Sequence, residues 1–119
     1  MKRVLIVDDD ADILESLSSV LVEHFEVLEA RHGEEAWQTL QVQTFHALVL
    51  DLTMPVMDGE ALIEKLRMAG IVLPVVLASG VADLHRVAAR LGVEHISKPY
   101  DLAVLIDKLQ RMMANADGH

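Results

Sequence analysis

Short hydrophobic runs alternate with longer amphipathic stretches along the chain. Runs rich in Val, Leu and Ile recur at residues 4–7, 26–30, 47–50, 75–78 and 94–97. They have the length of β-strands, and most lack the polar alternation of a strand with one solvated face. Parallel strands buried on both faces show this pattern, so the chain is predicted to form five parallel strands.

Between and after these runs, apolar residues recur at spacings of three and four, as on one face of a helix. The first helix has its apolar residues at Ile13, Leu14, Leu17, Val20 and Leu21. Further helices are predicted at 33–40, 59–68, 82–91 and from 102 onward.

Capping residues flank several of these helices. Asp9 or Asp10 precedes the first helix, Asp58 the third and Asp101 the last, while Gly70 and Gly92 follow the third and fourth. Strands that alternate with helices give right-handed crossovers and a doubly wound α/β sheet with helices on both faces. One domain is expected over residues 1–119, with 114–119 as a frayed or truncated end.

Polar residues that could take part in catalysis or ligand binding lie where the predicted strands end. Asp8 and Asp9 follow the first strand, Asp51 the third, Ser79 the fourth and Lys98 the fifth. Ligands bind at the carboxyl ends of the strands in such folds, and these ends meet at one edge. Several carboxylates in one partly desolvated crevice raise one another's pKa values or recruit a cation.

The charges of Asp8, Asp9, Asp51 and Lys98 sum to −2, which one Mg²⁺ ion would neutralise. Magnesium prefers oxygen ligands and is commonly held by carboxylates together with phosphate oxygens. A single Asp at a strand end is more often a helix cap, which is our interpretation of Asp10 and Asp58, whereas the convergence of four charged groups favours a magnesium and phosphate site.

Composition narrows the range of functions. With 119 residues, 52% of them hydrophobic, the chain suits one domain, and its formal charge of −9 disfavours nucleic acid and anionic lipid as partners. No cysteine is present, which excludes disulfides, a thiolate nucleophile and Cys-containing zinc sites. The run at 4–7 is too short for a signal peptide and the run at 71–78 too short for a membrane span, so we expect a soluble, cytoplasmic protein.

Three motifs resemble those of the receiver domains of two-component response regulators, and the resemblance covers essentially the whole chain. They are VLIVDDD at 4–10, DLTMPVMDG at 51–59 and SKPY at 97–100, which are similar to the family's first strand with its acidic pair, its phosphoacceptor loop and its lysine–proline turn. The resemblance implies a flavodoxin-like (βα)5 fold with strand order 2-1-3-4-5.

The same resemblance implies that Asp51 attacks the phosphorus of a phosphohistidine, on a histidine kinase or phosphotransfer protein, or of a small phosphodonor. The product is an acyl phosphate. Mg²⁺ would be ligated by Asp9, Asp51 and the backbone carbonyl of Thr53, with Asp8 acting largely through bound water. Lys98 would pair with a phosphoryl oxygen, so that catalysis is positioning plus charge stabilisation.

Ser79 matches the family's Ser/Thr switch, whose hydroxyl turns toward the phosphoryl group, and Gly80 would let the backbone approach that group closely. The resemblance also implies a cis peptide bond between Lys98 and Pro99. His95 departs from the family, which usually has Tyr or Phe there as the partner of the Ser/Thr switch. It is either a switch whose charge state changes near neutral pH or an ordinary strand histidine.

The function expected from these residues is a signalling switch rather than an enzyme with external substrates. Phosphorylation would alter the face made by the fourth helix, fifth strand and fifth helix, to which a downstream protein or a second copy would bind. We expect nothing upstream of Met1, and the chain is either a stand-alone regulator or part of a longer protein that carries an output domain.

Two enzymatic or cofactor-binding alternatives fit less well. A magnesium-dependent phosphohydrolase acting through an aspartyl-phosphate would carry a second acid two residues beyond its nucleophile, where this chain has Thr53, and no substrate-cap insertion is present. A flavin-binding module would need a loop rich in Gly and hydroxyl side chains after the first strand, where this chain is acidic.

Overall fold

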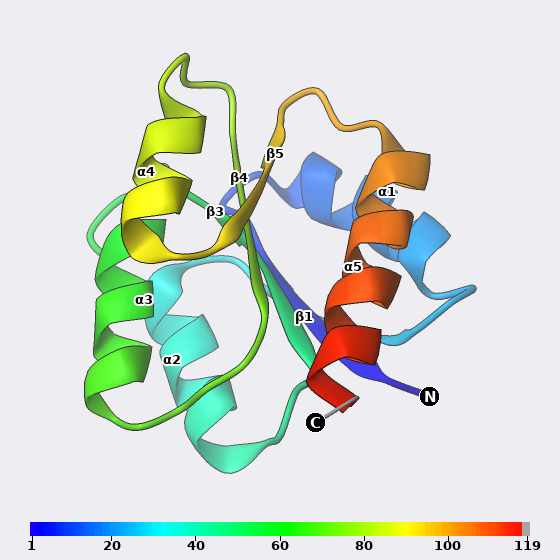
Figure 1. Cartoon of the computed structure of the whole chain (residues 1–119), viewed down its shortest axis with the longest axis horizontal. Coiled ribbons are helices and arrows are strands. Elements are labelled where there is room, and N and C mark those ends of the chain that lie inside the picture. The colour runs from blue at the N-terminus through cyan, green and yellow to red at the C-terminus, as the bar shows by residue number, and fades with distance from the viewer. Residues whose placement is uncertain (118–119) are drawn as a thin grey trace.

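Five parallel strands form one sheet in the order β2-β1-β3-β4-β5 (Figure 1). The structure is a computed structural model that describes residues 1–117, and residues 116 and 117 are described by their backbone only. The strands are β1 (Arg3–Val7), β2 (Glu26–Ala30), β3 (Ala47–Asp51), β4 (Val75–Ser79) and β5 (Glu94–Ser97). The predicted fold class and the strand order implied by the resemblance are both confirmed.

Helices cover both faces of the sheet. They are α1 (Ala11–Leu21), α2 (Gly33–Val42), α3 (Gly59–Met68), α4 (Leu84–Leu91) and α5 (Leu102–Asp117). Figure 1 shows α1 and α5 on one face and α2, α3 and α4 on the other. None of the helices within residues 1–117 is long and apolar enough to cross a membrane.

Two hydrophobic clusters, one under each helical layer, explain the unbroken apolar runs. Along β1, Leu5 packs with the cluster under α2, α3 and α4, whereas Val4 and Ile6 pack with the cluster under α1 and α5. Successive side chains of a strand point to opposite faces, so a sheet covered on both sides needs apolar residues at every position.

Aspartate caps begin three of the helices as expected. The side chain of Asp10 accepts from the backbone N–H groups of Asp12 and Ile13, and Asp58 and Asp101 cap α3 and α5 in the same way. Gly92 follows α4 with φ +70°, the left-handed conformation that glycine adopts without strain.

The structure corrects some boundaries. The predicted helix at 82–91 begins only at Leu84, because Asp83 has φ −100° and ψ 21° and its side chain makes no capping hydrogen bond. The second helix continues to Val42. The backbone of 114–117, assigned to a frayed end, continues α5, while 118 and 119 lie outside the described residues.

A close approach between α3 and β3 fixes the loop that follows Asp51. A Cβ atom on Gly59 would lie 2.7 Å from the carbonyl oxygen of Asp51, so only glycine fits there. The Gly59 N–H also donates to the Leu52 carbonyl at 2.9 Å. The start of α3 therefore closes the loop from 52 to 58 against the end of β3.

Candidate functional site

Three carboxylates converge at the carboxyl edge of the sheet. Asp8 and Asp9 follow β1, Asp51 ends the adjacent β3, and one oxygen from each lies within 4.8 Å of the others. Asp8 and Asp51 are only 2% and 5% exposed, whereas Asp9 is open to solvent. The structure thus brings together the three acids that the sequence placed at strand ends.

Lys98 reaches the same point from the end of β5. Its Nζ lies 2.8 Å from Asp8 Oδ2 and 3.4 Å from Asp51 Oδ1. Its backbone N–H donates to the Ser79 carbonyl at 2.9 Å, and its peptide bond to Pro99 is cis. The lysine therefore supplies a positive charge to two buried acids.

Backbone N–H groups orient the two buried carboxylates. Asp8 Oδ1 accepts from the N–H of Asp10 at 2.9 Å, and Asp51 Oδ1 accepts from the N–H of Thr53 at 3.3 Å. Among the contacts of the described residues, both interactions of the Asp51 carboxylate fall on Oδ1. Its Oδ2 atom is left without a hydrogen-bond or ion-pair partner from this part of the chain.

Burial and charge shift the protonation of this pair in directions that suit a cation site. Burial, with the charge of Asp8 added, raises the pKa of Asp51 from 3.8 to about 6, against the lowering effect of Lys98 and of the Thr53 N–H. Burial alone would lower the pKa of Lys98, but its hydrogen bond to Asp8 and the charges of both acids outweigh it and raise that pKa. At neutral pH most Asp51 is ionised and Lys98 is protonated.

Ser79 ends β4 beside this cluster and is buried. Its hydroxyl oxygen accepts from the N–H of Val81 at 3.1 Å, and the contacts of the described residues give this hydroxyl no bond to Asp51. A Cβ atom on Gly80 would meet nothing within 4 Å, so no close approach requires glycine at this position in the present conformation.

His95 and the Thr53 side chain stay apart from the carboxylates. His95 is exposed on β5, opposite Leu77 in the register, and the Ser79 position pairs with Ser97 two residues further along. Thr53 is exposed and reaches Asp51 through its backbone N–H. The structure does not bring His95 into the site.

Tyr100 belongs to this region, although in the sequence it stands out only as the last residue of the SKPY motif. It is partly buried against the cluster under α1 and α5. Burial raises the pKa of its hydroxyl, and the charges of Asp8 and Asp51 raise that pKa further. Its place directly after Pro99 is the signal that could have found it.

The donor set fits a hard divalent cation. Three carboxylates offer oxygen ligands, and with Lys98 they leave a net charge of −2 in a largely buried crevice. Such oxygen donors suit Mg²⁺ better than soft metals, and the open side at Asp9 leaves room for water or phosphate oxygens. The residues present can therefore hold a divalent ion.

The fold and this edge define a flavodoxin-like α/β protein with an acidic site at the carboxyl ends of its strands, and solved structures share the fold. A CheY-like response regulator receiver domain protein from Methanospirillum hungatei is 28% identical with a TM-score of 0.90, over 99% of this chain and 98% of that one. CheY4, a chemotaxis response regulator of Vibrio cholerae, is 28% identical with a TM-score of 0.85, over 94% and 98%.

The chain belongs to the family of response regulator receiver domains, whose family model matches residues 4–110. It is 35% identical to the transcriptional regulatory protein PrrA of Mycobacterium tuberculosis over 93% of this chain and 49% of that protein. It is 28% identical to the cell cycle response regulator CtrA of Brucella ovis over 98% and 52%. The chain thus spans about half the length of the curated relatives it matches.

Proposed function

We propose that this receiver domain is a phosphorylation-controlled switch whose Asp51 accepts a phosphoryl group from the phosphohistidine of a histidine kinase or phosphotransfer protein. The observation that carries the proposal is the state of the Asp51 carboxylate. Oδ1 is held by Lys98 and the Thr53 N–H, and Oδ2 has no partner among the described residues. An oriented carboxylate with one free oxygen suits in-line attack on phosphorus.

In the transfer, a bond forms between Asp51 and phosphorus while the bond from phosphorus to the histidine nitrogen breaks. Asp9, Asp51 and the Thr53 carbonyl would hold Mg²⁺, with Asp8 acting through water, and the ion would neutralise charge on the phosphoryl oxygens. Lys98, already within 3.4 Å of Asp51, is placed to pair with a phosphoryl oxygen while it keeps its contact with Asp8.

Ser79 would transmit the change. Its hydroxyl would leave the Val81 N–H and turn to the phosphoryl group, which would draw in the loop at Gly80. That movement would alter the face made by α4, β5 and α5, where a downstream protein, an output domain or a second copy would bind. We include His95 on β5 as a candidate second switch residue.

The proposal is tested by incubating the chain with Mg²⁺ and acetyl phosphate or phosphoramidate, followed by intact mass spectrometry. A phosphoryl adduct is expected with the unaltered chain and not with Asp51→Asn or in the presence of a chelator. Asp58→Asn is the matched control, because Asp58 lies in the same loop but caps α3, a role that Asn also fills. Absence of an adduct with every donor would refute the proposal.

A second assay separates the switch from an enzyme. We expect no sustained release of phosphate from generic phosphomonoesters, because Thr53 cannot act as the acid that such turnover needs. Multiple turnovers on external substrates would contradict this expectation. The proposal also places the chain in the cytoplasm, with its phosphodonors.

For His95, the measurement is the change in affinity for a downstream partner on phosphorylation, across roughly pH 6 to 8. A change that depends on pH in the unaltered chain but not in His95→Phe supports a switch linked to the charge of the imidazole. A pH-independent change in both would make His95 an ordinary strand residue.

A further inference from the structure

A second cavity lies at the opposite edge of the sheet from Asp51. Its volume is about 390 Å³, and it is bounded by the end of α3, the loop before β4, the turn between α4 and β5, and α5. Val75, the first residue of β4, lies in its wall, whereas Ser79 at the other end of that strand borders the acidic site. The cavity is therefore separate from the phosphoacceptor site.

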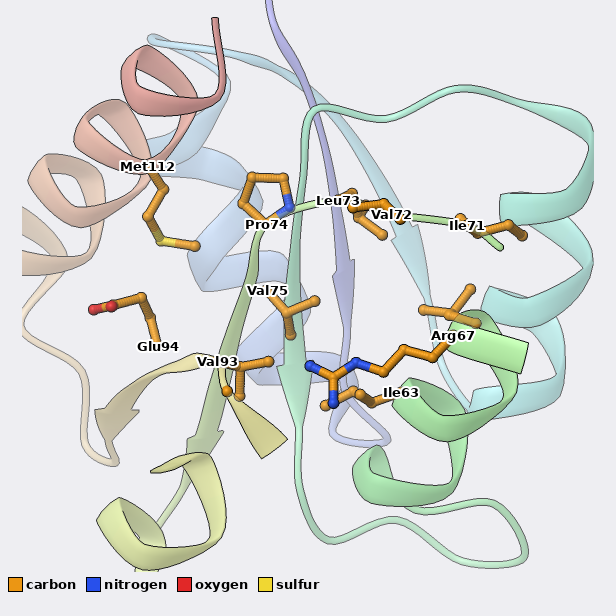
Figure 2. A pocket seen from close by; sticks show the side chains of 12 residues that line it. Ile63, Arg67, Ile71, Val72, Leu73, Pro74, Val75, Val93, Glu94 and Met112 are labelled. Atoms are coloured by element: carbon orange, nitrogen blue, oxygen red, sulfur yellow. The ribbon is translucent and has the colours of Figure 1, made fainter. Parts of the chain in front are cut away.

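Most of the cavity wall is aliphatic. Figure 2 shows Leu73, Pro74 and Val75 in the cavity wall, together with Val93 from the turn after α4 and Met112 from α5. Small-molecule sites in proteins are concave, mainly apolar and roughly 300–1,000 Å³ in volume, with a few polar groups that fix orientation. The volume lies near the lower end of that range, which suits a ligand smaller than a typical drug molecule.

One cation, the solvent-exposed Arg67, borders this apolar surface. Arg67 extends from α3 with its guanidinium pointing toward the turn after α4, which carries Val93 (Figure 2). Nη2 donates to the carbonyl oxygen of Leu91, the last residue of α4. That is the one hydrogen bond of this guanidinium within the described part of the chain, where it also forms no ion pair within 4.0 Å, so most of its five N–H donors are available.

The acidic residue of the lining is already paired. Glu94 Oε1 lies 3.0 Å from Nζ of Lys108, so this carboxylate does not compensate Arg67. In a chain with a formal charge of −9, the cavity thus combines an unpaired arginine with aliphatic walls. A guanidinium binds carboxylates through two parallel hydrogen bonds, a geometry that an ammonium group cannot match.

We propose that this cavity binds a small aliphatic monocarboxylate. Its carboxylate pairs with Arg67 and its hydrocarbon chain lies along Val75, Val93 and Met112. The inference goes beyond the phosphoryl switch and does not depend on it, because Asp51 takes no part in the cavity.

The test is a titration of the full chain with octanoate, followed by two-dimensional ¹H–¹⁵N NMR. Saturable shifts are expected at the cavity residues and not at Asp8 or Asp51. Octanol and octylammonium are the matched probes, because they keep the hydrocarbon chain and remove or reverse the charge. Octanoate should bind at least fivefold more tightly than either of them.

Variants test whether the positive charge of Arg67 holds the carboxylate. Arg67→Gln should weaken octanoate at least fivefold and leave octanol unchanged, while Arg86→Gln, an exposed arginine on α4 outside the cavity, should change neither. Because Arg67 also donates a hydrogen bond to the Leu91 carbonyl, its substitution could change the local structure, so a second variant that keeps Arg67 is needed. Val93→Asp places a carboxylate near the guanidinium and should abolish octanoate binding while sparing octylammonium.

Three results would overturn the inference: equal binding of the three probes, octanoate binding that survives Arg67→Gln, and no saturable binding in the millimolar range. Acetyl phosphate labelling of Asp51 in the same variants keeps the two proposals apart. Normal labelling with failed octanoate binding rejects the cavity inference alone, and the reverse result rejects the phosphoryl switch alone.

Discussion

Without a bound metal ion, Lys98 supplies the positive charge that balances the buried carboxylates. Its ammonium lies within 3.4 Å of two carboxylates that are almost fully buried, and buried acids without a counter-charge are strongly destabilising. The same position, however, places a positive charge next to the proposed metal ligands. Lys98 should therefore stabilise the fold and the phosphorylated state but oppose Mg²⁺ binding.

This conflict gives a test at Lys98. Lys98→Gln should bind Mg²⁺ about five- to tenfold more tightly, because removal of one positive charge at this distance is worth on the order of 1 kcal/mol in a partly screened site. The variant should at the same time be phosphorylated more slowly by acetyl phosphate. Calorimetric Mg²⁺ titration and intact-mass kinetics measure the two effects, and weaker Mg²⁺ binding would contradict the role we give to Lys98.

The raised pKa of Asp51 predicts a pH-dependent stability. A carboxyl whose folded pKa is above its unfolded value disfavours the ionised folded state, so the destabilisation is full above about pH 6 and is lost progressively as pH falls from about 6 to 3.8. The metal-free chain should therefore gain stability relative to Asp51→Asn between pH 7 and pH 4, by at most about 3 kcal/mol.

Urea unfolding of both chains at several pH values measures this difference, with Asp58→Asn as the control that retains the slope of the unaltered chain. Titration of the acids that do not interact with Asp51 cancels in the comparison. A difference between the two chains that does not vary with pH would show that the Asp51 carboxyl is not perturbed.

Among the secondary-structure elements, the N-terminal ends of the helices show which features of the local sequence predict a helix start. Asp10, Asp58 and Asp101 were predictable caps because Asp accepts from backbone N–H groups at the first turn. The structure begins α4 two residues later than the sequence predicts, since Asp83 precedes the helix without capping it. His32, whose Nδ1 accepts from the Glu35 N–H, caps α2 although histidine is not a typical cap.

Gly59 matters for a reason that no local pattern reveals. Its neighbour is the carbonyl of Asp51, brought close by the packing of α3 against β3. Gly59→Ala should destabilise the chain by about 2 kcal/mol or more, because a Cβ at 2.7 Å forces the backbone apart. The same shift should slow labelling of Asp51.

Gly80→Ala is the matched control for stability. A Cβ there meets nothing within 4 Å, so the unphosphorylated chain should be almost unaffected. If Gly80 lets the loop approach a phosphoryl group, this variant should still lose part of the conformational change on phosphorylation. Thermal unfolding separates the two glycines, and equal losses in both variants would contradict the steric argument.

For the whole molecule, the fold was predictable because both faces of the sheet are covered, which makes the central strands β1, β3 and β4 nearly continuous apolar runs. The acidic site followed from topology, since carboxyl ends of parallel strands share one edge and Asp8, Asp51 and Lys98 stand at those ends. The position of His95 relative to Ser79 was not predictable, because it depends on the register of β5 against β4. The cavity at Arg67 needs four elements to meet, and no motif records that.

Mg²⁺ should stabilise the whole domain against unfolding. An ion that binds only the folded state at ten times its Kd adds about 1.4 kcal/mol, which thermal unfolding with and without MgCl2 detects. Asp9→Asn should lose most of this gain while keeping the buried contact between Asp8 and Lys98. NaCl at equal ionic strength is the control, and an equal gain from NaCl would indicate screening of the acidic surface rather than a site.

The two ends of α4 are held very differently. At its C-terminal end Arg67 bonds to the Leu91 carbonyl and Arg90 pairs with Glu60 at 2.6 Å, whereas its N-terminal turn has no side-chain cap. A pull from the Ser79 loop would therefore tilt the helix about a fixed pivot, with displacement shrinking toward Gly92. Amide hydrogens of the first turn should exchange with solvent well before those of the last, and uniform exchange along α4 would mean that the helix moves as one rigid piece.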